Sequence, residues 1–262
     1  MRAVKIYLKL LRMNLMSSLQ YKGWPIMVAQ VFIVVITEPI GIVLLFMRFG
    51  NVGAWSAEKI LFIYAAAVTS FGLAETLCRG FDYFPWRMLK QGGLDRLLLR
   101  PCPLIPQVAG SVCHIHRLSR VAGGIFIMVW CAIRMEIIIG AAGIVSLVLG
   151  LCGGFLMYSG VFILTSGVAF FTIEGLDWIY ILTNVSYNVT KCPADYMPDA
   201  LRRLFTFLLP VLVISYYPAS NLCGWGEAYW KGFAALPAGI LFLLLSLAVW
   251  NYGLKKYKSA GS

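Results

Sequence analysis

The chain has 262 residues, of which 60% are hydrophobic and only 13% are charged. Soluble domains carry about 25% charged residues, so the composition excludes an ordinary soluble protein and predicts an all-α integral membrane protein, with residues 1–262 forming one transmembrane domain. The net charge of +11 does not indicate nucleic-acid binding, because the basic residues cluster at the ends of apolar runs rather than on a polar domain. The seven cysteines include no C-x-x-C pair, and we predict no metal site.

The first 22 residues predict an interfacial helix. Arg2, Lys5, Lys9 and Arg12 fall on one sector of a helical wheel, with apolar residues over most of the rest. This pattern is typical of a helix that lies on an anionic membrane surface. A cleaved signal peptide is not indicated, because both a central apolar stretch and a small-residue cleavage site are missing.

Several apolar runs are long enough to cross a membrane, which takes about 20 helical residues. They are residues 24–47, 57–77, 107–133, 137–171 and 232–253. The sequence that follows the fourth run leaves two arrangements open. In the first, a short fifth span runs from about residue 178 to 191, and residues 198–222 form a re-entrant hairpin on the outer side. In the second, residues 172–200 are a cytoplasmic loop and residues 202–222 are the fifth span.

Both arrangements give six spans with both termini in the cytoplasm. The positive-inside rule favours the second, because it places Lys191, Arg202 and Arg203 inside. Pro210 and Pro218 favour the hairpin, because they would remove backbone hydrogen bonds from a continuous helix, and broken backbone at membrane depth needs surrounding protein or water.

Glu38 is the one ionisable residue that the pattern places clearly at membrane depth. It follows Lys22 by about 24 Å along a helix, which puts it in the outer half of the first span. A carboxylate there is costly and faces a partner or a cavity. Glu38 is therefore either structurally paired or protonated, or it lines a substrate pathway. His114 and His116 are interpreted as interfacial polar residues on different helix faces.

Small residues and missing motifs add two expectations. Glycines 153, 160 and 167 recur every seven residues, which allows another helix to approach closely, within the chain or in a second subunit. No P-loop occurs, since the chain lacks even one Gly-Lys dipeptide. We therefore expect no catalytic residue and no cofactor in this chain, and any ATP-derived energy must come from another protein.

A basic connector, residues 79–101 (RGFDYFPWRMLKQGGLDRLLLRP), interrupts the apolar sequence. Its prolines and glycines predict two short helices, at residues 86–91 and 94–100, with a hinge at Gly92 and Gly93 and a stop at Pro101. Arginine and aromatic side chains commonly anchor protein interfaces. The connector is thus interpreted as a cytoplasmic docking surface, the alternative being a loop that touches only lipid headgroups.

These features resemble a known family. The stretch GGLDRLLLRP at residues 92–101 is similar to a G-x-L-D-x-L-L-L-R-P pattern, with Gly93 where an acidic residue is expected. Together with RGFD at residues 79–82 and the proline-rich residues 196–219, it makes the chain resemble the six-span permease subunits of bacterial type-2 ATP-binding cassette (ABC) exporters without a fused ATPase. Outer re-entrant helices in that family favour the first arrangement.

The resemblance implies a multi-pass plasma-membrane protein in which two permease chains, identical or related, form the pathway. A dimer of separate ATPase subunits would bind ATP and Mg and dock on the connector. Membrane lipids would be further partners, and the substrate would be amphipathic: a lipid, glycolipid, drug or peptide. The expected ATPase-coupling residues are Asp82, Trp86, Arg87, Leu94, Asp95 and Arg100.

Two other classes of protein remain as alternatives. A stand-alone secondary transporter or channel would need ionisable residues on several facing spans, whereas Glu38 is the one that the pattern indicates. A membrane-embedded transferase would need a cluster of polar catalytic groups near one leaflet, and the two histidines do not supply it.

Overall fold

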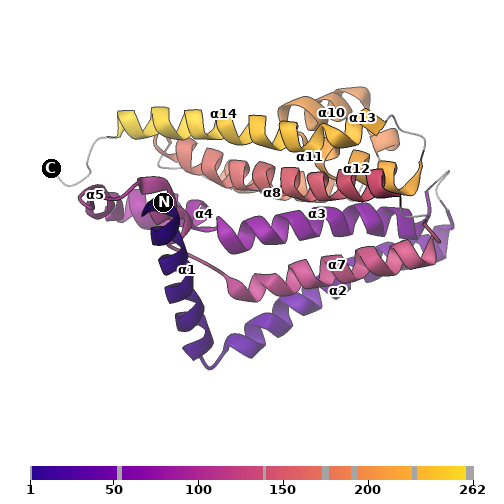
Figure 1. The fold of residues 1–262 in the computed structure, drawn as a ribbon, viewed down its shortest axis with the longest axis horizontal. Helices are drawn as coiled ribbons and strands as arrows, with labels where there is room; N and C mark the ends of the chain where they lie inside the picture. The colour runs from indigo at the N-terminus through magenta and orange to yellow at the C-terminus, as the bar shows by residue number, and fades with distance from the viewer. Residues whose placement is uncertain are drawn as a thin grey trace.

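The computed structural model describes residues 2–51, 55–137, 140–172, 177–189, 194–225 and 229–257. The regular elements in these ranges are all helices, as the composition predicts. The long helices run side by side along one axis, and α1 (Arg2–Gln20) lies across them at one end (Figure 1).

Among the described residues, five helices are long and apolar enough to cross a membrane, close to the runs expected from the sequence. They are α2 (Trp24–Phe49), α3 (Ala57–Leu77), α7 (Leu118–Arg134) with the 3-10 turn η2 (Ile115–Arg117) before it, α8 (Ala141–Ala169) and α14 (Ala235–Lys256). The shorter elements are α4 (Gly80–Phe84), the π-helical η1 (Pro85–Lys90), α5 (Gly93–Leu98), α6 (Leu104–Ala109), α9 (Asp177–Val189), the 3-10 turn η3 (Ala194–Tyr196), α10 (Asp199–Arg203), the π-helical η4 (Leu204–Leu208), α11 (Val211–Ile214), α12 (Tyr216–Cys223) and α13 (Tyr229–Phe233).

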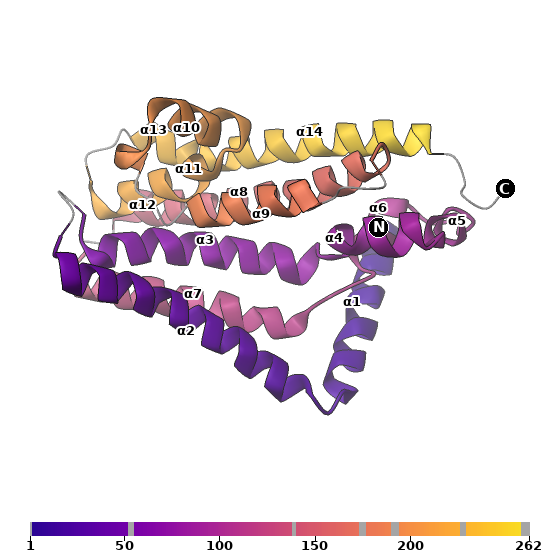
Figure 2. The same cartoon turned by 180° about the vertical axis from the view of Figure 1, so that it is seen from behind.

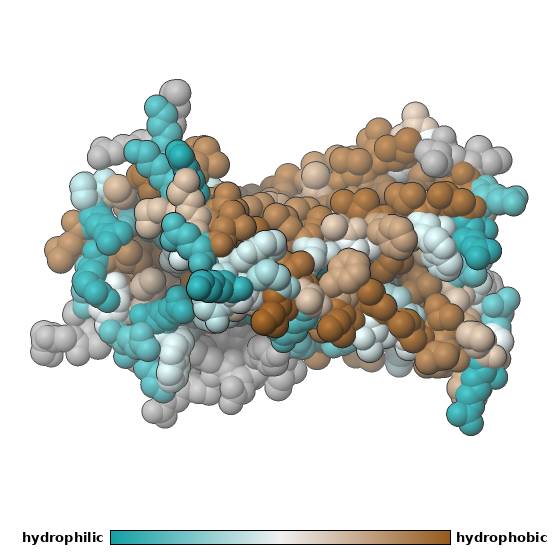
Figure 3. All heavy atoms as spheres, turned by 90° about the horizontal axis from the view of Figure 1, so that it is seen from below, coloured by the Kyte–Doolittle hydropathy of each residue, from teal (hydrophilic) through white to brown (hydrophobic). Residues whose placement is uncertain are grey.

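The surface has the distribution of a membrane protein. In Figure 3 apolar residues cover the middle of the face shown, and hydrophilic residues gather at both ends. A bilayer selects this pattern, because its hydrocarbon core excludes charged groups while the two interfaces accept them. The chain is therefore a multi-pass integral membrane protein.

Helix α1 is tied to the bundle by polar contacts rather than inserted into it (Figure 2). Tyr7 Oη donates a hydrogen bond to the carbonyl of Leu77 over 2.8 Å, and Asn14 Nδ2 donates to the carbonyl of Gly110, also over 2.8 Å. Lys9 on the same helix is exposed. This position matches the predicted interfacial helix.

The bundle has two distinct ends. We call the end with α4, η1 and α5 the connector end, and the opposite end, where Trp55 lies, the far end. Trp55 Nε1 donates to Asp195 Oδ2 over 3.2 Å, and the Trp55 ring packs edge-on against Trp225 with centroids 5.3 Å apart. Asp195 precedes the segment 198–222 and Trp225 follows it, so the chain enters and leaves this segment at the far end.

The segment between them is a bent hairpin. Its two halves, Asp199–Leu208 and Val211–Cys223, differ in direction by 70°. Pro210 lies at the break, and Pro218 lies in the first turn of α12, where a missing backbone N–H costs little. A bend of this size occurs in a broken span or in a re-entrant loop, and the far-end contacts on both sides of the segment fit the hairpin of the first arrangement, which stays a prediction together with α9 as the short fifth span. The expected end of that span near Lys191 lies outside the described residues.

The glycine stripe of α8 packs within the chain. A Cβ added at Gly153 would meet the backbone of Ala235 on α14, and one at Gly160 would lie 2.9 Å from the ring of Phe242. At Gly167 the added Cβ would lie 2.9 Å from the backbone nitrogen of Trp250. The stripe therefore lets α14 lie directly on α8. Of the two expected partners, a helix of the same chain or one of a second subunit, the structure shows the first.

The third span begins later than predicted. Residues 107–133 were expected to form one apolar run, but α6 ends at Ala109 and the span begins at Ile115. The buried Gln107 side chain donates to the carbonyl of Cys102 over 3.0 Å, and α6 packs against α1. Hydropathy alone missed this break, because the residues of α6 are apolar for contact with protein rather than with lipid.

Candidate functional sites: the connector and a buried charged cavity

The connector consists of two short helical segments joined at a glycine, but their bounds differ from the prediction. The first segment begins at Gly80 rather than Trp86, because α4 continues through Pro85 into η1. A proline has no N–H to donate, and a widened π-helical turn accommodates that loss. Gly92 has a φ of +66°, the left-handed conformation that ends the first segment, which confirms the predicted hinge.

Aromatic side chains fix the connector to the ends of two spans. The Phe84 ring lies 4.6 Å from Trp250 on α14 and 5.4 Å from Phe170 at the end of α8, measured between centroids. Phe81 also packs edge-on against Trp250, at 5.2 Å. These three phenylalanines and Trp250 form an aromatic joint, so force applied to the connector reaches α8 and α14.

Three of the predicted coupling residues face outward. Trp86 is 56% exposed, and Arg87 and Arg100 are also exposed. Lys90 Nζ lies 4.6 Å from the centroid of the Trp86 ring, which gives this surface a cation–π pair. The structure therefore brings basic and aromatic groups together on one accessible surface.

The other three predicted coupling residues hold the connector in place. Leu94 is fully buried, and Asp95 Oδ1 accepts a hydrogen bond from Tyr257 Oη over 3.3 Å. Asp82 Oδ2 lies 3.0 Å from Arg79 Nε in an ion pair. Burial raises the pKa of Asp82 above its usual value, and the positive charge of Arg79 offsets this only in part. These residues hold the connector in place and are less accessible than Trp86, Arg87 and Arg100.

Gly93, the departure from the family pattern, also has a local explanation. A Cβ at this position would lie 2.9 Å from the carbonyl oxygen of Arg87 and 3.1 Å from Met88 Sδ. The glycine therefore allows α5 to lie close against η1, where an acidic side chain would crowd the turn.

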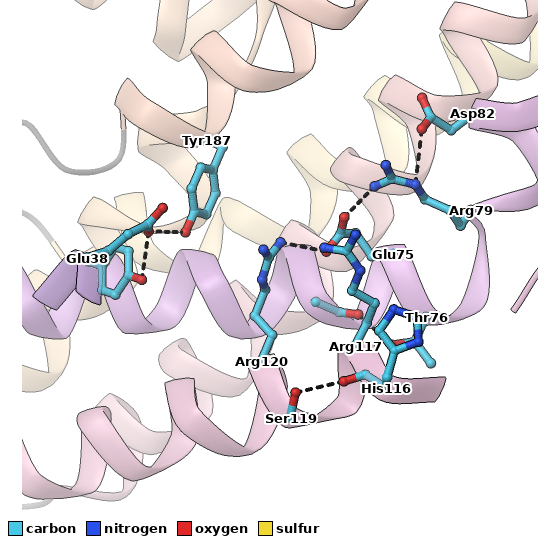
Figure 4. Close-up of polar contacts among 12 residues, drawn as sticks. Glu38, Glu75, Thr76, Arg79, Asp82, His116, Arg117, Ser119, Arg120 and Tyr187 are labelled. Carbon is cyan, nitrogen blue, oxygen red and sulfur yellow. Dashed lines mark hydrogen bonds and ion pairs between the residues drawn. The ribbon is translucent and has the colours of Figure 1, made fainter. Parts of the chain in front are cut away.

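A buried carboxylate that the sequence did not indicate lies next to the connector. Glu75, on the last turn of α3, is 2% exposed and pairs with three arginines (Figure 4). Its Oε1 pairs with Arg79, and its Oε2 lies 2.6 Å from Arg120 Nη1 and 3.3 Å from Arg117 Nη1. The cluster ties α3, the start of α4 and the start of α7 to one another.

Glu38 lies on the other side of a polar cavity from this cluster. Its Oε2 accepts hydrogen bonds from Tyr64 Oη over 2.8 Å and from Tyr187 Oη over 2.6 Å. The guanidinium of Arg120 lies 6.0 Å from the ring centroid of the same Tyr187 and 5.5 Å from that of Phe71. A cavity of about 210 Å³ is lined by Glu38, Phe71, Glu75, Arg79, Asp82, Arg117, Arg120, Thr183, Asn184 and Tyr187.

The expectation that Glu38 is the one charge at depth was therefore wrong. Glu75 and Arg120 are buried on two further spans and face each other. Part of this was readable from the sequence, since Glu75 and Arg79 are four residues apart and share a helix face. No partner could be assigned to Arg117 and Arg120 from the sequence, because nothing local to them indicates an acidic residue.

The two histidines also differ from their interpretation. His114 precedes η2 and is not on a helix with His116, so their rings lie side by side with centroids 5.1 Å apart. Burial lowers the pKa of His114 to about 4, and the positive charges of Arg79, Arg117 and Arg87 and the proximity of His116 act in the same direction. Within the described residues, no group of three or more His, Cys, Asp or Glu side chains is arranged to hold a metal ion.

Comparison with known proteins agrees with this architecture. No curated protein matches the sequence. A family model described as ABC-2 family transporter protein matches residues 32–261, which include most of the first span, the later spans, the connector and the bent segment 198–222. A match over this length shows the family: the chain belongs to the ABC-2 family of transporter proteins and is a permease subunit of an ABC transporter.

Proposed function

We propose that this chain is the permease of an exporter that is driven by a separate ATPase. Two permease chains form the translocation pathway, and a dimer of ATPase subunits, which binds ATP and Mg, docks on η1 and α5. The chain lies in the plasma membrane, with the connector and both termini on the cytoplasmic side. The substrate is amphipathic, as a lipid, glycolipid, drug or peptide would be.

The observation that carries the proposal is the combination of an exposed connector surface with a rigid joint behind it. Trp86, Arg87 and Arg100 are accessible to a partner, while Phe84 and Trp250 lock the same connector onto the spans. A partner that moves the connector would therefore move α8 and α14 rather than a loose loop. Glu38 and the cavity beside it lie between α2, α3, α7 and α9, and the same movement would reach them through Arg79, which joins the start of the connector to Glu75 on α3.

Charge reversal on the exposed surface tests the docking. We expect Arg87→Glu combined with Arg100→Glu to abolish the ATP hydrolysis that co-purifies with the tagged chain, because like charges replace attractive contacts. Arg134→Glu, at the exposed far end of α7, is the matched control. Equal ATPase recovery from the double variant and the control would refute docking at this surface.

A stand-alone ion-coupled transporter is the second candidate, and the buried Glu75 and Arg120 satisfy one of its requirements. The family membership nevertheless favours an ATP-driven mechanism. Transport by the purified chain in liposomes, without nucleotide or ATPase and driven by an ion gradient, would support the second candidate instead.

A further inference from the structure

We propose that the charged cavity between α2, α3, α7 and α9 binds a phosphate-type oxyanion. The oxyanion would be either the phosphate of a lipid-like headgroup or free phosphate. The idea that this oxyanion belongs to the transported substrate rests on the proposed function. The binding of an oxyanion in the cavity does not.

The first observation is an excess of hydrogen-bond donors. Arg79, Arg117 and Arg120 all converge on Glu75, and each guanidinium carries several N–H donors and no acceptor. A single carboxylate cannot accept all of them. The Nε of Arg117 is buried and has no hydrogen-bond partner among the described residues. A tetrahedral oxyanion would provide the missing acceptors, and arginine is the side chain best suited to binding it.

The second observation is the charge balance at the arginine end of the cavity. Three arginines meet Glu75 and Asp82 there, which leaves one positive charge in excess. A phosphate monoester, as in phosphatidic acid, carries at least one negative charge and would neutralise this excess, whereas the choline of phosphatidylcholine already balances the charge of its own phosphate. A partly buried site makes this attraction stronger than it would be at an exposed surface.

The third observation is the position of the site. Arg79 lies at the junction of α3 with the connector, and Arg117 lies just before α7, so both are at the depth where a span leaves the membrane. Basic pockets between helices at this depth suit anionic lipid headgroups. The volume of about 210 Å³ accommodates a phosphate group with a few water molecules, but not a whole lipid, whose chains would remain outside.

Glu38 makes the proposal more specific. Its carboxylate lies at the other side of the same cavity and would repel a bound anion. Replacing it with glutamine should therefore strengthen oxyanion binding. If the arginines serve only to hold the helices together, the same replacement would leave anion binding unchanged.

The test uses the purified full-length chain in mixed micelles without nucleotide. Native mass spectrometry would compare retention of phosphatidic acid and of phosphatidylcholine with identical acyl chains, and inorganic phosphate would be titrated as the competing free anion. We expect selective retention of phosphatidic acid. Arg117→Gln should weaken it by about tenfold, the effect of losing one charge-assisted hydrogen bond. Arg117→Lys keeps the charge and provides a second reading if the glutamine variant does not fold.

Each outcome has a defined meaning. Retention of phosphatidic acid that Glu38→Gln strengthens and Arg117→Gln weakens supports a headgroup site. Binding of inorganic phosphate with the same response to both variants, and without lipid selectivity, supports a free-anion site. The proposal is overturned if neither phosphate source binds selectively, or if Arg134→Gln, the matched control at the opposite end of α7, weakens binding as much as Arg117→Gln.

Discussion

Replacement of Glu75 by glutamine is the most direct test of the buried ion cluster. Glutamine has nearly the same shape as glutamate but removes the charge that three arginines share. The side chain is 3% exposed, so bulk solvent screens its charge very little. Removing one partner from a buried ion pair typically costs about 3–5 kcal/mol, because the remaining charges stay desolvated without compensation.

An exposed ion pair on the same chain gives the matched control. Asp199 and Arg202 lie 2.8 Å apart, but their side chains are 76% and 46% exposed. Solvent screens such a pair, and its loss costs about 1 kcal/mol or less. We therefore expect Asp199→Asn to leave the unfolding temperature nearly unchanged, while Glu75→Gln lowers it by on the order of 10 °C.

The assay is thermal unfolding of the purified chain in detergent, followed by tryptophan fluorescence. The double variant Glu75→Gln with Arg120→Gln adds a second reading, because it removes one of the uncompensated cations together with the carboxylate. It should recover part of the lost stability, a non-additivity that indicates direct interaction. Equal shifts for Glu75→Gln and Asp199→Asn, or full additivity with Arg120→Gln, would refute the reasoning.

Three further outcomes are expected. Glu38→Gln should change the transport rate without reducing assembly with the ATPase, measured by transport and by co-purification; unchanged transport would remove Glu38 from the pathway. Gly92→Ala forces a side chain into a φ of +66° and should cost about 1–2 kcal/mol and reduce coupled ATP hydrolysis, whereas Gly224→Ala, with the same φ at the far end, should cost stability but spare coupling. Because burial holds the pKa of His114 at about 4, the unfolded chain takes up this proton first as the pH falls below about 6.5. The free energy of unfolding should therefore fall as the pH is lowered from about 6.5 to about 4, and His114→Gln should make this fall smaller. An equal fall in the two proteins would exclude this role of His114.

Sequence reasoning succeeded where the signal is local. The apolar runs located the spans, because any helix in contact with lipid must be apolar over its length. The left-handed turn at Gly92 and the break at Pro210 also follow from the properties of single residues. The connector was recognised for the same reason, since a basic segment between two apolar runs stands out in the chain.

Sequence reasoning failed where the partner is distant. Arg117 and Arg120 meet Glu75 across separations of 42 and 45 residues, and no pattern near any of them specifies this pairing. Leu94 shows the same difficulty in another form. Its place in a coupling motif suggested contact with a partner, yet it is fully buried, because the fold of the connector decides which side of α5 faces inward.

The buried cluster connects the connector with the cavity beside Glu38. Arg79 stands where α3 becomes α4, Glu75 joins it to Arg120, and Arg120 lies against the ring of Tyr187, which holds Glu38. A well-packed apolar group would stabilise this junction as well as or better than buried charges do. Stability alone therefore does not explain the cluster. Ion pairs differ from apolar contacts in being directional, so a shift of the connector changes which donors face the cavity. If the proposed function holds, an oxyanion bound there would be held or released by the same movement, which would couple the connector to the pathway.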